Sequence, residues 1–378
     1  MFNSQIIEKF KNLPTPFYYY DLGLLEENLQ TLDRISSSFG YKVHYALKAN
    51  ANDRILKLIY GYGFGADCVS GNEVKKALDI GFPKNKIVFA GVGKTDEEIN
   101  LALENEIQCI NIESIQEMEV INNLAEKFNR IVPIALRINP DLDAHTHHYI
   151  TTGLEENKFG VYQHDLDGAL DNLSSFKYLQ LIGLHFHIGS QISDLNVFKN
   201  LCLKVNEIQG RVEIRGIKLE HLNLGGGLGV DYQNPDNNLI SDFHNYLKPL
   251  ENQSVHFELG RSIVAQCGSL ISRVLYVKKG IKTRFAVLDA GMTELIRPAL
   301  YSAFHKIENL TGAGENQKYD IVGPVCETAD FFGKGVELPE VKRGDLIAIR
   351  TTGAYGQVMA SHYNLRDFAD VVYSDFKE

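Results

Sequence analysis

The sequence predicts a (β/α)8 TIM-like barrel followed by a C-terminal, mainly β domain. Eight short β-rich runs alternate with helical patterns between about residues 20 and 258. Polar or glycine residues recur where these runs end, and beyond Arg261 strands continue without regular helices between them. Because a parallel barrel places all its strand ends on one face, we expect these residues to form a single site.

The barrel elements follow from local patterns, taken in chain order. A helix over about Leu24 to Ser38 precedes the first strand. Ser/Thr-x-x-Glu capping boxes then predict helices that begin directly after strands, as at Ser70, Thr95 and Ser114. With seven helices between the strands, a doubly wound open sheet is the alternative to a barrel. The predicted strands are 43–48, 65–69, 86–90, 109–112, 134–138, 181–187, 221–224 and 255–258.

The C-terminal part has a different pattern. The segments 269–277, 283–289 and 345–350 are β-rich. We therefore expect one domain over 20–260 and a β-rich domain over 261–378 that also includes residues 1–19. Within the barrel, the polar stretch 139–158 is expected to be a long loop over the strand ends, in a conformation that the sequence does not specify.

Composition restricts the class of partner. The 378 residues are 44% hydrophobic and carry a net charge of -10 without a long basic run, so we expect a small-molecule partner and no nucleic acid. No apolar run approaches the roughly 18 residues that a membrane span needs, and the N-terminus lacks an export signal. Five cysteines, never in a CxxC pair, favour the cytoplasm over a disulfide framework or a zinc site.

The strand-end residues suggest specific chemistry. Lys48, at the end of the first strand, could be an amine nucleophile if it points into the barrel mouth. The glycines of LNLGGGLG could approach a phosphate, although a triple glycine is more often a tight turn. His185 and His187 could bind a metal, but no carboxylate or cysteine cluster completes such a site and none is expected. His187 could instead stack on a planar cofactor, or it could simply be a core histidine.

Glu258 ends the eighth strand, where an isolated buried carboxylate would be costly. A salt bridge with Arg261 would explain it structurally, and a protonated ring nitrogen would explain it functionally. An amine nucleophile, a phosphate cradle, a stacking ring and a buried carboxylate together are what pyridoxal 5'-phosphate requires. We therefore expect this cofactor.

The motifs support the same cofactor. YALKAN, FGADCVSGNE, HFHIGSQI, LNLGGGLG, ELGR, RPALYSAFH, GPVCETADFF and GAYGQVMASHYN closely resemble the diaminopimelate decarboxylase family, over about Pro16 to Asn364. The resemblance implies decarboxylation of meso-2,6-diaminopimelate to L-lysine and CO2, the last step of lysine biosynthesis. It also implies that Lys48 forms the Schiff base, that His187 stacks on the ring and that Glu258 contacts the ring nitrogen.

The remaining site residues come from the same resemblance. The phosphate is expected at Ser190 and the glycine loop, with Gly260 and Arg261 nearby, and Asp67 supports the lysine. Cys326 matches the candidate proton donor. The resemblance also implies a homodimer, because in that family the segments with Cys326, Glu327 and Tyr355 enter the neighbouring subunit's active site. The glycine loop is Gly225, Gly226 and Gly227, and the expected substrate residues are Arg261, Arg297, Tyr301, Glu327 and Tyr355.

Three other functions stay open from the sequence. A sister decarboxylase would act on carboxynorspermidine, ornithine or arginine, whose distal end lacks a carboxylate, whereas Arg261 and Arg297 favour a carboxylate. A catalytically silent regulator on the same scaffold is disfavoured by the intact Lys48, His187, Glu258 and Cys326. An amino-acid racemase would share the barrel and the lysine but would release no CO2.

Overall fold

The computed structural model describes residues 2–142, 157–247, 250 and 253–376. These residues form two compact units. One unit contains Asn28–Gly229 and Leu239–Gly260, and the other contains Met1–Glu27, Val230–Asn238 and Arg261–Glu378. Residues 230–238 therefore belong to the second of these units, although they lie between two barrel strands in the sequence.

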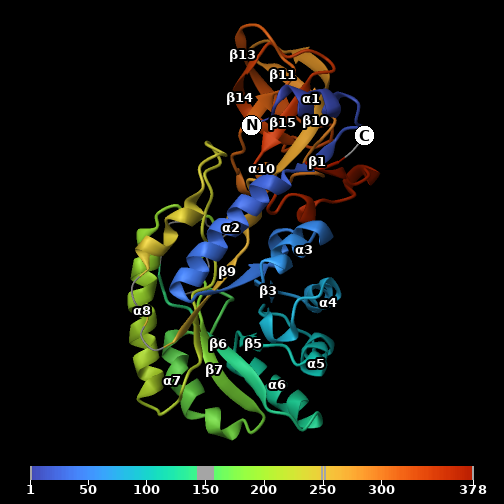
Figure 1. Ribbon diagram of the computed structural model, residues 1–378. Helices are drawn as coiled ribbons and strands as arrows, with labels where there is room; N and C mark the ends of the chain where they lie inside the picture. The colour runs from blue at the N-terminus through green and yellow to red at the C-terminus, as the bar shows by residue number, and fades with distance from the viewer. Residues whose placement is uncertain (1, 143–156, 248–249, 251–252, 377–378) are drawn as a thin grey trace. The chain divides into compact units, whose positions relative to one another are not determined.

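The first unit is built on a closed barrel of parallel strands (Figure 1). Each strand pairs with the next, and β2 also pairs with β9, with Val43 opposite Phe257. This closure confirms the predicted barrel, and the open-sheet alternative is wrong. The strands are β2 (Lys42–Ala46), β3 (Gly65–Cys68), β4 (Ile87–Phe89), β5 (Cys109–Ile112), β6 (Val132–Arg137), β7 (Leu179–His185), β8 (His221–Asn223) and β9 (Ser254–Leu259).

Helices cover the outside of these strands (Figure 1). They are α2 (Leu22–Phe39), α3 (Asp53–Gly61), α4 (Gly71–Ile80), α5 (Asp96–Asn105), α6 (Ile115–Lys127), α7 (Gln163–Asp171) and α8 (Asn196–Glu213), with 3-10 turns η1 (Leu47–Ala49), η2 (Lys84–Lys86) and η4 (Leu173–Ser175). The prediction of a helix between the last two strands is wrong. The only helical elements among the described residues there are the 3-10 turns η5 (Leu239–Ser241) and η6 (Phe243–Tyr246). Most of the expected loop 139–158 lies outside the described residues.

The predicted caps start the helices where expected. The side chains of Ser70, Thr95 and Ser114 each accept a hydrogen bond from the amide three residues later. Only Thr95 forms the full reciprocal box with its glutamate. In the other two helices the glutamate reaches one residue further back, as when Glu117 accepts from the amide of Glu113 at 2.6 Å. These contacts fix the chain direction just after β3 and β5.

A layer of three histidines fills the barrel interior at the amino-terminal side of the strands. His44 Nδ1 donates to the carbonyl oxygen of Lys86 at 3.2 Å, and its Nε2 accepts from His256 Nδ1 at 3.3 Å. The ring of His221 stacks on that of His256 with centroids 4.4 Å apart. A side chain at Gly183 would overlap His221, so glycine on the neighbouring strand makes room for the imidazole.

The second unit is built on a mixed sheet in the order β12-β15-β10-β11-β13-β14, with β1 pairing with both β10 and β16. Its strands are β1 (Phe17–Tyr20), β10 (Gly268–Lys279), β11 (Arg284–Leu288), β12 (Ile307–Asn309), β13 (Asn316–Val322), β14 (Phe331–Pro339), β15 (Leu346–Arg350) and β16 (Asp370–Tyr373). The short helices are α1 (Ser4–Lys11), α9 (Arg261–Val264), α10 (Arg297–Tyr301), η7 (Gln357–Met359) and η8 (Tyr363–Leu365). The predicted mainly β part is thereby confirmed.

The core of this unit joins the two ends of the chain. Phe10 and Phe17 pack in one buried cluster with Ile271 and Leu346, and Val372, near the C-terminus, packs against this cluster.

None of the helices in the described residues is at once long enough and apolar enough to span a membrane.

Candidate active site

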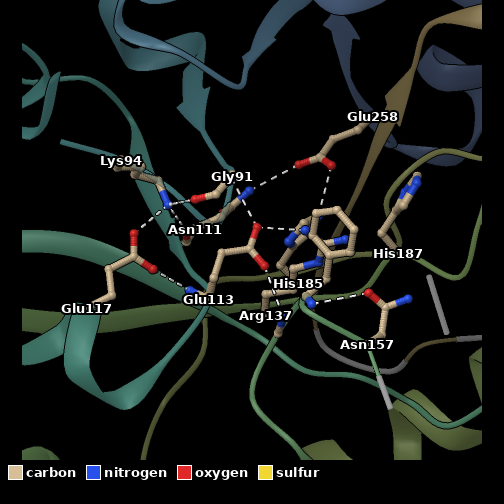
Figure 2. Close-up of polar contacts among 12 residues, drawn as sticks. Gly91, Lys94, Asn111, Glu113, Glu117, Arg137, Asn157, His185, His187 and Glu258 are labelled. Carbon is tan, nitrogen blue, oxygen red and sulfur yellow. Dashed lines mark hydrogen bonds and ion pairs between the residues drawn. The ribbon is translucent and has the colours of Figure 1, made fainter. Parts of the chain in front are cut away.

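Glu258, in β9, lies at the centre of a buried polar network at the carboxyl ends of the barrel strands (Figure 2). Its Oε2 lies 2.8 Å from His185 Nε2, and its Oε1 accepts from Asn111 Nδ2 at 3.1 Å and from Asn223 Nδ2 at 2.7 Å. Burial by itself would raise the pKa of Glu258, but His185 and the positive charge of Lys48 bring that pKa well below its usual range. Glu258 is therefore a buried carboxylate anion.

Lys48 lies next to this network, but not at a strand end as expected. β2 ends at Ala46, and Lys48 is the middle residue of the 3-10 turn η1. Its Nζ lies 3.7 Å from Oδ2 of Asp67, which is the next-to-last residue of β3 and is fully buried. Burial and the charge of Glu258 raise the pKa of Asp67 to about 8, while the Lys48 ammonium acts in the opposite direction. The amine therefore lies beside two acidic groups with different proton affinities.

His187 follows β7, which ends at His185, so the two histidines do not share a strand as expected. The amide of Gly226 donates to His187 Nδ1 at 3.2 Å, so this nitrogen carries no proton. Burial, together with the cations Lys48 and Arg137, holds the pKa of His187 well below its ordinary value. The side chain is thus a neutral imidazole, with the flat face that stacking on an aromatic ring requires.

The glycine loop is packed too tightly for any other residue. A Cβ at Gly225 would overlap the carbonyl oxygen of Phe186, and a Cβ at Gly226 would overlap that of Glu258. The amides of Gly225 and Gly226 do not point to open space, because they donate to Asn223 Oδ1 and His187 Nδ1. Two of the three amides expected to cradle an anion are therefore bound within the protein.

A second ion pair lies below Glu258 (Figure 2). Arg137 Nη1 donates to Glu113 Oε1 at 2.6 Å, and the amides of Gly91 and Gly160 donate to the same carboxylate at 3.0 Å each. The guanidinium of Arg137 also lies over the ring of Phe159, 4.7 Å from its centroid. Glu113 thus ties together the segments that follow β4, β5 and β6.

Sequence reasoning missed Asn111, Glu113 and Asn223. All three lie at or just after the carboxyl ends of strands β5 and β8, where the same strand-end rule applied to Lys48 and Glu258 would have found them. Their residue types gave no functional signal, because asparagine is common in turns and neither Asn111 nor Glu113 belongs to a recognised motif.

The other predicted residues lie in the β unit. Tyr232 Oη accepts from Arg261 Nη1 at 2.7 Å and from Arg297 Nη1 at 2.8 Å, so two buried guanidinium groups converge on one hydroxyl. Arg261 also lies over the ring of Tyr355, 4.7 Å from its centroid. Arg297 Nη1 further contacts His305 Nε2 at 2.9 Å. Paired cations of this kind favour an anion such as a carboxylate.

Cys326 and Glu327 are exposed in the same unit. The hydroxyl of Tyr363 donates to Glu327, and the amide of Cys326 lies 3.4 Å from Asn364 Oδ1. Tyr301, at the end of α10, is half-buried. The barrel unit therefore brings together Lys48, Asp67, His187, the glycine loop and Glu258, and the β unit contains Arg261, Arg297, Tyr301, Cys326, Glu327 and Tyr355.

The barrel residues fit a planar cofactor that has an aldehyde and a basic ring nitrogen. Both carboxylate oxygens of Asp67, together with Asn111 Oδ1 and His185 Nδ1, are buried and make no hydrogen bond among the described residues. Buried polar atoms are rarely left without partners, so these atoms favour a polar ligand here. In the described part of the chain, no three His, Cys, Asp or Glu side chains are grouped so that they could hold a metal ion.

Comparison with known proteins agrees with this geometry. The family model for "pyridoxal-dependent decarboxylase, pyridoxal binding domain" matches residues 25–268. A diaminopimelate decarboxylase of Bacteroides thetaiotaomicron is 55% identical over 98% of this chain and 98% of its own length. One from Helicobacter pylori strain J99 is 42% identical over 97% of this chain and 91% of its own. A crystal structure of the Helicobacter pylori enzyme with L-lysine superposes with a TM-score of 0.92 at 41% identity, over 98% and 94% of the two chains.

Proposed function

The chain belongs to the diaminopimelate decarboxylase family of pyridoxal-dependent decarboxylases, and we propose that it converts meso-2,6-diaminopimelate to L-lysine and CO2. The single observation that supports this most is Glu258, a buried carboxylate kept charged by His185 and two asparagines. Such an anion suits a protonated pyridine nitrogen, which a decarboxylating pyridoxal enzyme needs. L-Lysine as the product places the reaction at the end of lysine biosynthesis.

The barrel residues have distinct parts in the proposal. Pyridoxal phosphate, when bound, supplies an electron sink for the electron pair that CO2 leaves behind. Lys48 holds the cofactor through its amine, with Asp67 3.7 Å away to hold or release a proton beside it. His187 stacks its neutral ring on the cofactor, and Glu258 accepts a hydrogen bond from the ring nitrogen. Ser190, Gly227 and Gly260 bind the phosphate, while Gly225 and Gly226, whose amides donate within the protein, shape the loop beside it.

The β unit provides the substrate contacts in this proposal. Arg261 and Arg297 bind the distal carboxylate, and Tyr301, Glu327 and Tyr355 contact the rest of the distal end. The shared contact of both arginines with Tyr232 supports this role, because it holds two cations in one direction. Ornithine, arginine and carboxynorspermidine lack a distal carboxylate and would leave these cations without a counterion.

The step that completes the reaction is protonation of the carbon that has lost CO2. We assign the donor to the thiol of Cys326, with Lys48 as the alternative. One proton enters as one CO2 leaves, so the reaction needs no oxidant or second substrate. Cys326 is exposed, so its thiol is open to an incoming ligand or subunit.

We propose a homodimer in which Cys326, Glu327 and Tyr355 serve the active site of the partner subunit. Large apolar side chains are exposed on the segment that follows Tyr355, including Val358, Leu365 and Phe368. Leu365 is 93% exposed, and burial of such an apolar side chain against a partner subunit would stabilise a dimer. The hydrogen bond from Tyr363 to Glu327 connects this apolar segment to a proposed substrate residue.

Mixing two inactive variants tests the shared site. Lys48→Ala and Cys326→Ala are each expected to be inactive as homodimers. Subunit exchange should restore about a quarter of wild-type activity, because about half of all dimers are then mixed and each mixed dimer has one intact site out of two. No recovery after confirmed exchange would show that each subunit uses its own Cys326.

Activity assays test the reaction itself. Purified protein with pyridoxal phosphate should release CO2 and L-lysine from meso-diaminopimelate, and Lys48→Ala should retain its fold but not turn over. If CO2 were released only from ornithine, arginine or carboxynorspermidine, the assignment of the substrate would be wrong. Racemised amino acid without CO2 would indicate a racemase. Failure to bind the cofactor would indicate the silent regulator.

None of the five cysteines, all of which are described, forms a disulfide, in keeping with the cytoplasmic location that we propose.

A further inference from the structure

Asn223 connects the glycine loop to Glu258. Its Oδ1 accepts the amide hydrogen of Gly225 at 2.9 Å, which leaves its Nδ2 to donate to Glu258 Oε1 at 2.7 Å. The carbonyl of Gly225 in turn accepts from the amide of Glu258 at 2.8 Å. The three residues form a closed ring of hydrogen bonds, so the orientation of the asparagine amide is fixed by its partners.

Asn111 reaches the same carboxylate oxygen from β5, on another side of the barrel. Its Nδ2 donates to Glu258 Oε1 at 3.1 Å, and its side chain is fully buried. An amide nitrogen has hydrogens to donate and no lone pair to offer, so an oxygen with two amide donors cannot carry the proton itself. Oε2 lies 2.8 Å from His185 Nε2. Three strands thus hold Glu258 as an acceptor in one orientation.

From this geometry we infer that Asn111 and Asn223 are positioning residues that keep Glu258 ionised and in one orientation. They affect the reaction only through the group that Glu258 contacts. The inference rests on the proposed function, in which that group is the cofactor's ring nitrogen. A protonated Glu258 would lose the charge that holds a proton on the ring nitrogen, and the electron sink would weaken. Asn223 has a second effect, because it also fixes the amide of Gly225.

Substitution by aspartate isolates this role. Asn223→Asp keeps an oxygen for Gly225 and nearly the same volume, but it replaces the donor with an oxygen about as close to Glu258 as the present 2.7 Å. Two carboxylates at this distance share one proton, so the pair is no longer fully ionised. Asn111→Asp makes the same change without touching the glycine loop. We expect each variant to lose roughly 100-fold in kcat with a smaller change in KM.

The test compares two cofactors in the same variants. One is pyridoxal phosphate, and the other is its analogue with a carbon in place of the ring nitrogen. With pyridoxal phosphate, the aspartate variants should change the pH dependence of the bound cofactor's absorbance and bind it more weakly. With the analogue, the variants and the wild type should agree within about twofold in binding, because Glu258 then has no nitrogen to serve. Equal losses with both cofactors would overturn the inference.

Two controls separate this role from general damage. Asn105→Asp adds the same charge on helix α5, where the side chain of Asn105 donates a hydrogen bond to the carbonyl of Leu101, and it should behave as wild type. In a Glu258→Gln background, Asn111→Asp should cause no further loss, whereas an undiminished loss would count against the inference. If the wild type binds cofactor but releases no CO2, the proposed function fails, while the absorbance comparison still decides the roles of Asn111 and Asn223.

Discussion

Replacing His221 with glutamine should make the barrel unit less sensitive to acid. His221 is buried in the histidine layer, stacked on His256 and enclosed where Gly183 leaves room. Burial lowers the pKa of His221 from 6.5 to about 4, and the neighbouring His44 and His185 act in the same direction, while Glu258 opposes them. Two lysines act on the neighbouring histidines in the same direction. Lys42 lowers the pKa of His256, and Lys86 lowers the pKa of His44.

The sign of the effect follows from where the protons bind. Between pH 6.5 and about 4 the unfolded chain protonates this histidine and the folded chain does not. The contribution of neutral His221 to the free energy of unfolding is therefore fully present above pH 6.5, and it is lost as the pH falls toward about 4. For His221 alone, the loss at about pH 5 amounts to about 2 kcal/mol of unfolding free energy relative to neutral pH.

Urea unfolding followed by circular dichroism measures this difference. Wild type and His221→Gln are compared between about pH 7 and about pH 5 at a constant cofactor concentration, so that only the difference in slope matters. The wild type should lose about 2 kcal/mol more than the variant over this range. Parallel curves would show that His221 is protonated equally in both states, and the reasoning from its burial would be refuted. His164, which is exposed, provides a matched control as His164→Gln.

Three further outcomes follow from the structure. Gly226→Ala places a Cβ against the carbonyl of Glu258, so we expect about 2 kcal/mol lower stability and weaker cofactor binding, measured by urea unfolding and absorbance titration. Tyr232→Phe removes the hydroxyl shared by Arg261 and Arg297, and KM for meso-diaminopimelate should rise roughly tenfold while the cofactor's Kd is unchanged. An unchanged KM would remove Tyr232 from the substrate site. Glu258→Gln should lower kcat roughly 100-fold in steady-state assays, and near wild-type turnover would contradict its assigned role.

Local signals in the sequence determined the barrel's elements. Each strand was predictable because apolar alternation and flanking caps act within a few residues, as Ser70 and Thr95 show at the starts of α4 and α5. Lys48, His187 and Glu258 were found because each lies at or just past the end of such a strand. The missing helix between β8 and β9 was a local error, since the intervening segment is polar and forms only short 3-10 turns where it is described.

The tertiary structure decided which of these residues meet. β2 and β9 close the barrel although some two hundred residues separate them. β1, near the start of the chain, pairs with β10 and also with β16 near the end of the chain. Asn111 and Asn223 reach the same oxygen of Glu258 only because strand register places their side chains in the same layer. Local sequence sets the strands, whereas pairing over long separations depends on backbone hydrogen bonds and side-chain packing that exist only once the barrel has closed.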